Sequence, residues 1–259
     1  MSNSLCILTD NTAQLPYGGF PGQRLIKILP LRTETQSVSA PTVDDFLHVY
    51  RDLEREFNAI LVLTLSNHLL PVAENATQAS MRHGGIAHIA VLDSRQTAAG
   101  LGMLAQLGAQ AAFDGEPLAG VEDRVRGAIP HIYTLIYAEA ESLSQHGYLS
   151  PAELSSEALG PFPLFVLEDG QLVPYKKVRT RRHLLECFQE FLEEFETPRQ
   201  IAFLHAKNST LRSRPLRELA KNLFPETPFS EVDMSAPLVG LFGSQAVGMT
   251  VMEMPGGRK

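Results

Sequence analysis

Small polar side chains directly follow the first apolar run of the chain. Leu5–Leu8 is typical of a buried strand, and it leads into Thr9, Asp10, Asn11 and Thr12. These residue types bond nearby backbone and build turns, so an Asx turn without a ligand explains them as well as a site does. In an open α/β sheet, however, ligands bind beyond the carboxyl ends of the strands. The pattern therefore predicts that Thr9 and Asp10 face a ligand crevice.

Asp10 is also the one candidate for a nucleophile, which would give hydrolase or phosphotransferase chemistry by analogy with other strand-end sites. No second acid stands two residues later, and the sequence holds no phosphate-binding GxxxxGK[ST], no GxSxG and no HExxH. Gly100 and Gly102 lie inside a helical pattern, not after a first strand, so they make no dinucleotide fingerprint. The eight histidines are scattered. We expect no enzyme, no catalytic residue, no metal site and no cofactor.

The densest basic run is Tyr175–His183, YKKVRTRRH, in an otherwise acidic chain. Such a run is most often a solvated strand end. A functional interpretation is that cations beside a helix N-terminus attract phosphate or an acidic partner. Nucleic-acid binding would need interleaved aromatic residues, and only Tyr175 is near. The net charge of −7 also argues against nucleic acid and against an anionic membrane surface.

The first half of the chain alternates strand and helix signals. Thr42 followed by Asp45 is typical of a capping box, and the run of seven apolar or small residues 59–65 fits a strand covered on both faces. Strands are expected near residues 5–8, 25–29, 59–65, 87–92 and 132–137, and helices near 42–57, 71–83, 97–113 and 118–129. This alternation predicts an α/β domain over residues 1–145, with a mostly parallel sheet flanked by helices.

The second half has a different pattern. Apolar runs on either side of Asp169-Gly170 predict a β-hairpin over residues 163–175, and Thr180 opens an amphipathic helix. A strand at 200–205, a helix at 211–223 and two short strands ending near Met252 follow. We therefore expect an α+β domain over 146–259, joined to the first through a connector within 145–163, with the ligand crevice between the two domains.

Bulk composition indicates a globular protein of the cytoplasm. The chain has 259 residues, of which 44% are hydrophobic and 20% charged, enough to bury a core. Cys6 and Cys187 have no CxxC spacing and fit small buried side chains in a reducing compartment. We find no leader pattern and no apolar run near ~20 residues, so a cytoplasmic protein without integral membrane association is expected.

Six short motifs carry a resemblance to a known family. They are Thr9–Ala13, Ser39–Thr42 with Phe46, Leu65–Leu69 with Ala76, Leu92–Arg95 followed by Gly100–Gly102, Val173–Arg181, and His205-Ala206. In this order they resemble the TDSTA, TSQPT, LSSxLSGTYxSA, DSxxxSxGxG, strand-to-helix and VHA segments of the DegV family. Members are two-domain bacterial proteins that bind a fatty acid between their domains, and some present the acyl chain to a separate fatty-acid kinase. The resemblance implies that function and that partner here.

This chain departs from the family pattern where the resemblance places the fatty-acid carboxylate. The family uses hydroxyls of TSQPT and LSG, an Arg of GGRI and a His near the C-terminus. Here those positions hold Val38, Leu70–Val72, Tyr148 and Phe242. A buried carboxylate needs donors or a cation, because an unpaired buried charge is costly. The substitutions therefore predict a crevice that takes a less charged head group or a purely apolar molecule. The alternative is a crevice filled by side chains, in a regulatory or interaction protein that has lost its lipid.

Some donors remain if a free fatty acid binds. Arg179 falls on a family arginine and would contribute most, because charge-assisted hydrogen bonds are the strong ones. The predicted ligand-binding residues are Thr9, Asp10, Ser39, Ser66, Asn67, Ser94, Tyr148, Arg179 and Phe242.

Overall fold

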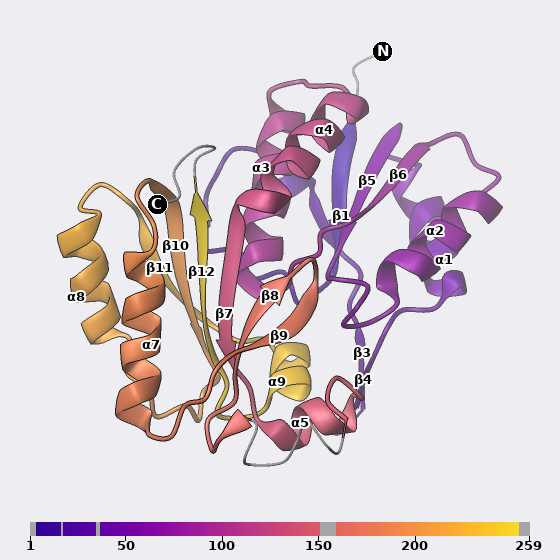
Figure 1. The fold of residues 1–259 in the computed structure, drawn as a ribbon. Helices are drawn as coiled ribbons and strands as arrows, with labels where there is room; N and C mark the ends of the chain where they lie inside the picture. Colours follow the sequence, from indigo (N-terminus) through magenta and orange to yellow (C-terminus); the bar gives the residue numbers. More distant parts are fainter. Residues whose placement is uncertain (1–3, 17, 35–36, 151–158, 254–259) are drawn as a thin grey trace. The chain divides into compact units, whose positions relative to one another are not determined.

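The structure is a computed structural model of the chain, and it describes residues 4–16, 18–34, 37–150 and 159–253. By their contacts the described residues divide into two units. Unit 1 comprises the residues up to Glu34 together with Val38–Pro130. Unit 2 comprises Ser37 and the described residues from His131 onward, and Figure 1 shows both units coloured along the chain.

Unit 1 contains a four-stranded parallel sheet in the order β2-β1-β5-β6. Every residue of β1 and β5 is buried, as the apolar runs predicted, because helices cover both faces of a parallel sheet. The strands are β1 (Leu5–Thr9), β2 (Ile26–Ile28), β5 (Ala59–Thr64) and β6 (His88–Asp93). A separate two-stranded sheet joins β3 (Arg32–Glu34) to β4 (Ser37–Ser39).

Two pairs of helices flank this sheet. In Figure 1, α3 and α4 lie on one face of it and α1 and α2 on the other. The helices are α1 (Val43–Leu53), α2 (Val72–Arg82), α3 (Ala98–Phe113) and α4 (Leu118–Ala128), with short 3-10 turns η1 (Gln23–Leu25) and η2 (Ile129–His131). The predicted capping box forms at α1, where Thr42 and Asp45 exchange hydrogen bonds. Gly102 lets α3 approach the segment after β1, since a Cβ there would overlap the carbonyl oxygen of Gln14.

Unit 2 contains a six-stranded mixed sheet in the order β11-β10-β12-β7-β8-β9. Only β10 and β11 are parallel, and the other neighbours are antiparallel. The strands are β7 (Ile132–Tyr137), β8 (Leu164–Glu168), β9 (Gln171–Lys176), β10 (Pro198–His205), β11 (Phe229–Asp233) and β12 (Val247–Glu253). The predicted hairpin is β8–β9, and its Asp169 and Gly170 both have positive φ, as a two-residue turn requires.

One face of this sheet carries the core of unit 2. Residues of β7, β10 and β12 such as Leu135, Phe203 and Met249 pack there with the apolar faces of α7 and α8. Phe188 and Phe203 meet edge to face, with ring centroids 6.2 Å apart. The helices are α5 (Ala140–Gln145), α7 (Arg181–Glu193), α8 (Arg214–Leu223) and α9 (Ala236–Phe242), and α5 packs against α9.

One expected strand belongs to a different sheet. We predicted that residues 132–137 extend the parallel sheet of the first domain, and this is wrong: β7 pairs antiparallel with β12 and β8. Its neighbours lie far away in the sequence, so only long-range pairing could reveal which sheet it joins. The contacts accordingly divide the chain after Pro130, whereas the sequence suggested a boundary after residue 145. Part of the expected connector, residues 151–158, lies outside the described residues.

Candidate functional site

Five of the predicted binding residues meet at the carboxyl ends of β1, β5 and β6. We call this cluster the polar edge, and it consists of Thr9, Asp10, Ser66, Asn67 and Ser94. Backbone bonds tie the strand ends together: the Ser66 amide donates to the Gln96 carbonyl at 2.8 Å, and the Ser94 amide donates to the Thr64 carbonyl at 3.2 Å. The side chains are buried except for Asn67, which is half-buried.

The Asp10 carboxylate joins the ends of β1 and β5. Its Oδ1 accepts from the amide of Thr12 at 2.9 Å and from the Thr12 hydroxyl, and its Oδ2 accepts from the amide of Leu65 at 2.8 Å. Burial raises the pKa of Asp10 above its ordinary value, while the hydrogen bonds from Thr12 and Leu65 act to lower it. Both oxygens are thus engaged in the fold, which argues against Asp10 as a nucleophile.

Asp93, which the sequence analysis did not single out, has a matching role one strand further along. Its carboxylate oxygens lie 3.3 Å from the donating amide of Asn67, and Oδ1 accepts from the amide of Arg95 at 2.9 Å. The side chain of Asn67 in turn caps α2, because its Oδ1 accepts from the amide of Glu74 at 3.1 Å. A carboxylate directly after a strand was the available sequence signal, as at Asp10.

The loop after β6 is strained and tightly bonded. Arg95 and Ala98 both have a φ of 51°, in the left-handed region that side chains other than glycine rarely adopt. The Ser94 hydroxyl donates to the Gln96 carbonyl at 3.2 Å and accepts from the Gln96 amide at 3.0 Å. Strain of this kind persists only where surrounding contacts hold the backbone in place. The loop therefore presents a rigid backbone to a ligand at the polar edge.

Three buried threonine hydroxyls near the polar edge have no hydrogen-bond partner among the described residues. They are the Oγ1 atoms of Thr9, Thr64 and Thr97. Thr97 is the N-cap residue of α3, yet its side chain does not cap the helix. A buried polar group without a partner is uncommon and indicates a place for water or another polar group.

In unit 1, the positions where the family has head-group hydroxyls hold the apolar side chains of Val38 and Leu70–Val72. Val38 on β4 is buried, and Pro71 precedes α2 without providing a side-chain cap. Ser39 is exposed. The segment after Ser39 is tied to α2, because the Asn75 amide side chain donates to the Pro41 carbonyl at 2.8 Å. Leu70–Val72 contains no hydroxyl. The side-chain hydrogen bond to the first turn of α2 comes from Asn67, whose Oδ1 accepts from the amide of Glu74.

In unit 2, Tyr148 and Phe242 belong to the α5–α9 region. Phe242 is fully buried, and its carbonyl accepts from the amide of Glu139 at 2.7 Å. Tyr148 is half-buried and stacks on His146, with ring centroids 5.8 Å apart. Burial raises the pKa of Tyr148 above its usual range, so the phenol stays protonated and can donate.

The basic run spans the end of β9 and the start of α7. Lys176 pairs with Glu190 at 2.6 Å, and Arg182 pairs with Glu186 at 2.9 Å. Arg179 and Arg181 are exposed and form no ion pair with any described residue. Arg179, the predicted head-group cation, is therefore available to a ligand.

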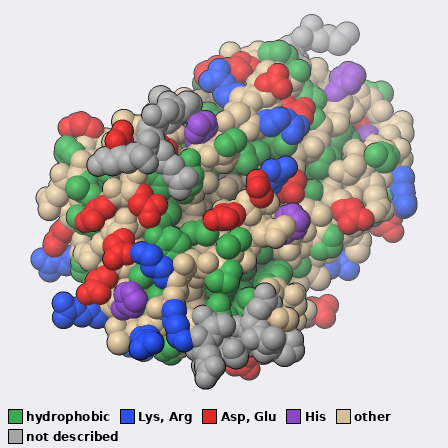
Figure 2. Space-filling view, in the orientation of Figure 1, with side chains coloured by type: hydrophobic (Ala, Val, Ile, Leu, Met, Phe, Trp, Pro, Cys, Tyr) green, Lys and Arg blue, Asp and Glu red, His purple; other side chains and the backbone are tan. Residues whose placement is uncertain are grey.

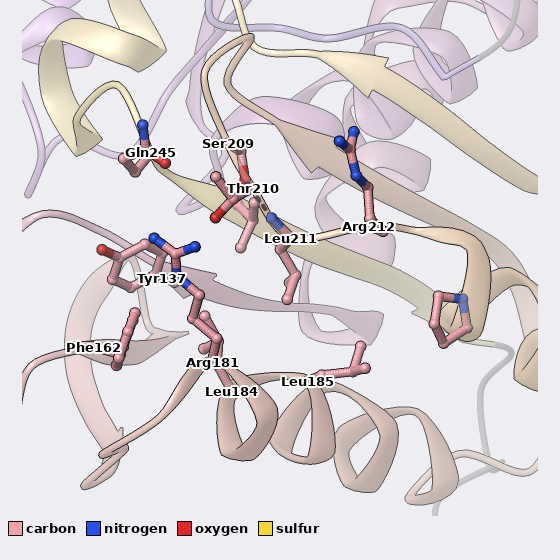
Figure 3. A pocket seen from close by; sticks show the side chains of 12 residues that line it. Tyr137, Phe162, Arg181, Leu184, Leu185, Ser209, Thr210, Leu211, Arg212 and Gln245 are labelled. Atoms are coloured by element: carbon pink, nitrogen blue, oxygen red, sulfur yellow. Dashed lines mark hydrogen bonds between the residues drawn. The ribbon is translucent and has the colours of Figure 1, made fainter.

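A pocket that the sequence analysis missed lies within unit 2, next to the start of α7. Its volume is about 250 Å³, and Figure 3 shows the side chains around it. It is lined by Tyr137, Phe162, Arg181, Leu184, Leu185, Ser209, Thr210, Leu211, Arg212, Pro215, Gln245 and Val247. The lining comes from distant parts of the chain, so only Arg181 in the basic run offered a sequence signal.

Among the described residues, no group of three or more His, Cys, Asp or Glu side chains is arranged to hold a metal ion. Within the same part of the chain, every helix is too short or too polar to span a bilayer.

Comparison with known proteins identifies relatives over nearly the whole chain. A family model described as an uncharacterised protein of the DegV family matches residues 20–254. The DegV domain-containing protein lmo2514 of Listeria monocytogenes is 24% identical over 285 residues, covering 96% of this chain and 99% of that protein.

Solved structures show the same fold. DegV of Bacillus subtilis, described as a fatty acid binding protein, superposes with a TM-score of 0.82 at 18% identity, over 98% of this chain and all of that one. The Fak B3 protein of the Streptococcus pneumoniae fatty acid kinase, loaded with linoleic acid, gives 0.79 at 14% identity, over 97% of this chain and all of that one. Since the family model covers most of its length, the chain belongs to the DegV family.

Proposed function

We propose that this protein binds a long-chain fatty acid or a related lipid and is not itself a catalyst. The observation that carries the proposal is the polar edge, where Asp10 and Asp93 hold three strand ends at fixed spacing. Both acids are engaged with backbone amides, so they hold the edge in place and are poorly suited to nucleophilic attack. The hydroxyls of Thr9, Thr64 and Thr97 have no hydrogen-bond partner among the described residues, so they can bond a polar group of a ligand at this edge. The relatives described as fatty-acid binding support the ligand class.

The head group is the specific question, because the family's hydroxyl, arginine and histidine positions are substituted in this chain. Arg179 is the strongest remaining donor, since it is exposed and has no ion pair with a described residue. Tyr148, with its protonated phenol, and the hydroxyls of Ser39 and Ser66 are weaker neutral candidates. A guanidinium can bind a carboxylate through two parallel hydrogen bonds. We therefore assign the carboxylate to Arg179 in this proposal.

A paired titration tests the assignment. Delipidated protein is titrated with palmitate and with methyl palmitate, using the unchanged chain, Arg179→Ala and Arg182→Ala. Losing a charge-assisted hydrogen bond worth about 1.5–3 kcal/mol should weaken palmitate binding roughly ten-fold or more in Arg179→Ala. Methyl palmitate should bind the variant as it binds the unchanged chain. Arg182→Ala is the matched control, because Arg182 lies on the same basic run but pairs with Glu186.

Two other results would change the proposed ligand or remove it. Equal binding of acid and ester by the unchanged chain would mean that the site takes a less charged head group. Absence of any bound acyl species in native mass spectrometry, together with no binding in the titration, would favour a regulatory or interaction protein that has lost its lipid.

The kinase component among the structural neighbours supports a second part of this proposal. We place the protein in the bacterial cytoplasm, where it would present its acyl chain to a separate fatty-acid kinase. A kinase assay with loaded protein should produce acyl phosphate, and the unloaded protein should produce none. Turnover by this chain alone would contradict the non-catalytic role.

A further inference from the structure

The pocket of unit 2 combines a polar side with an apolar side. In Figure 3, Arg181 extends from the start of α7 toward Tyr137, and Thr210 and Gln245 lie on the same side of the pocket. Leu185 belongs to α7, and Leu211 comes from the segment that precedes α8. Of the remaining lining residues, Phe162, Leu184, Pro215 and Val247 are apolar, and Ser209 and Arg212 are polar. Such a lining fits a ligand with one polar end, because apolar walls bury its body and a few polar groups fix its orientation.

The charges around α7 conflict with the helix itself. Arg181, Arg182 and His183 occupy its first turn, and that turn contains no acidic residue. Cations are unfavourable at a helix N-terminus, where the backbone amides already carry partial positive charge. Figure 2 shows basic side chains near this lower end of α7 and acidic ones further up. An anion in this place would relieve the conflict.

Two of the cations that line the pocket are not neutralised by the protein. Arg181 and Arg212 are exposed, and neither has an ion pair with any described residue. By contrast, Arg182 and Lys176, which do not line the pocket, pair with acids of α7 itself. The positive charge of Arg181 also reaches into the site, where it acts to lower the pKa of Tyr137 against the raising effect of burial and of Glu139.

The volume limits the size of the ligand. At the ~30 Å³ that a water molecule occupies in the liquid, a pocket of about 250 Å³ holds roughly eight groups the size of a water molecule. That is below the range usual for drug-sized ligands and too small for a whole long-chain fatty acid.

We propose that this pocket binds a small amphiphilic carboxylate, with an apolar body along Leu185 and Leu211 and a carboxylate held by the guanidinium of Arg181. This site is additional to the fatty-acid function proposed above. Its lining belongs entirely to unit 2 and includes none of the residues assigned there to the lipid head group. The neutral donors Thr210 and Gln245 complete the polar side.

The test uses octanoate as the probe and 1-octanol as its uncharged counterpart. The full chain is first saturated with palmitate, so that the proposed fatty-acid site is occupied, and binding is then followed by calorimetry. Three variants are compared with the unchanged chain. Arg181→Gln removes the charge that reads the carboxylate, Leu211→Trp fills the apolar side, and Arg182→Gln is the matched control on the same turn. Circular dichroism checks that each variant is folded.

Octanoate should bind the unchanged chain at least ten-fold more tightly than 1-octanol. Arg181→Gln should weaken octanoate binding several-fold and leave 1-octanol binding unchanged, because Arg212 still lines the pocket. Leu211→Trp should weaken both probes, while Arg182→Gln behaves like the unchanged chain. The proposal is overturned if octanoate does not bind, if palmitate displaces it, or if Arg181→Gln and Arg182→Gln bind it equally well. Displacement by palmitate would mean that octanoate binds at the fatty-acid site. That result would overturn the proposal for the pocket of unit 2 and leave the proposed fatty-acid function standing.

Discussion

The polar edge of unit 1 and the pocket of unit 2 use polar side chains in opposite ways. At the polar edge, the carboxylates of Asp10 and Asp93 accept several hydrogen bonds from neighbouring strand ends. In the pocket, Arg181 and Arg212 are exposed and form no ion pair with a described residue. Both regions carry ionisable side chains next to the start or end of a regular element.

The difference shows that the number of charged residues in a region says little about ligand binding. What matters is whether the surrounding protein already satisfies them. A buried, fully bonded carboxylate stabilises the fold, since a partner left behind after its removal would be buried and unsatisfied. An exposed, unpaired guanidinium adds little to stability and can be recruited by a ligand. Three measurements test this contrast.

The largest effect is expected from Asp10→Ala. The substitution leaves the buried amides of Thr12 and Leu65 without their acceptor, and each unsatisfied group costs about 1–3 kcal/mol. We expect the free energy of unfolding to fall by about 3 kcal/mol or more, measured by urea denaturation. Asp10→Asn keeps one acceptor oxygen, so its free energy of unfolding should lie between those of the unchanged chain and Asp10→Ala. A loss below about 1 kcal/mol for Asp10→Ala would show that Asp10 is not a structural tie.

The pH dependence of stability should have opposite signs for a buried acid of unit 1 and an exposed acid of unit 2. Burial raises the pKa of Asp10, so its contribution to stability is fully present below its unfolded pKa, ~3.9, and declines as the pH rises. The hydrogen bond from Lys176 lowers the pKa of Glu190. Its contribution is therefore present above the unfolded pKa, ~4.3, and is lost as the pH falls.

The measurement is the difference in unfolding free energy between the unchanged chain and Asp10→Asn or Glu190→Gln, from pH 3 to pH 7. The stability advantage of Asp10 over asparagine should shrink with rising pH. The advantage of Glu190 over glutamine should grow over the same interval, by no more than about 0.5 kcal/mol because the pair is exposed. If both stability differences changed in the same direction with pH, the assignment of one acid to the interior and the other to the surface would be contradicted.

The smallest effect is expected from Arg181→Gln. Because Arg181 is exposed and has no ion pair with a described residue, the unfolding free energy should change by less than about 0.5 kcal/mol. Urea denaturation without added ligand measures this. A loss above about 1 kcal/mol would mean that Arg181 supports the fold, and the contrast with Asp10 would disappear.

Short-range signals predicted much of the fold. The capping box of Thr42 and Asp45 and the turn at Asp169-Gly170 depend on residues within a few positions of one another, and both are present. The helices α5 and α9 were missed, because α5 spans only six residues and α9 is apolar nearly all round. Neither segment shows the 3.6-residue alternation that reveals an amphipathic helix.

The start of α8 was also misplaced. We expected a helix from Leu211, but α8 begins at Arg214 with Pro215 in its first turn. Proline is tolerated at a helix start and restricts the residue before it, so the apolar spacing alone was misleading.

The parallel sheet of unit 1, with Thr9, Asp10, Ser66 and Ser94 at its carboxyl edge, could be predicted from local sequence patterns. Each of these residues lies at or just after the end of β1, β5 or β6, and parallel strands end on the same side. The place of β7 in the second sheet, and the pocket lined by side chains as far apart in the sequence as Tyr137 and Val247, could not be predicted in this way. The difference comes from the range of the interactions. Turns and caps are fixed by neighbouring residues, whereas strand partners and cavity walls are chosen by packing between segments that the sequence separates widely.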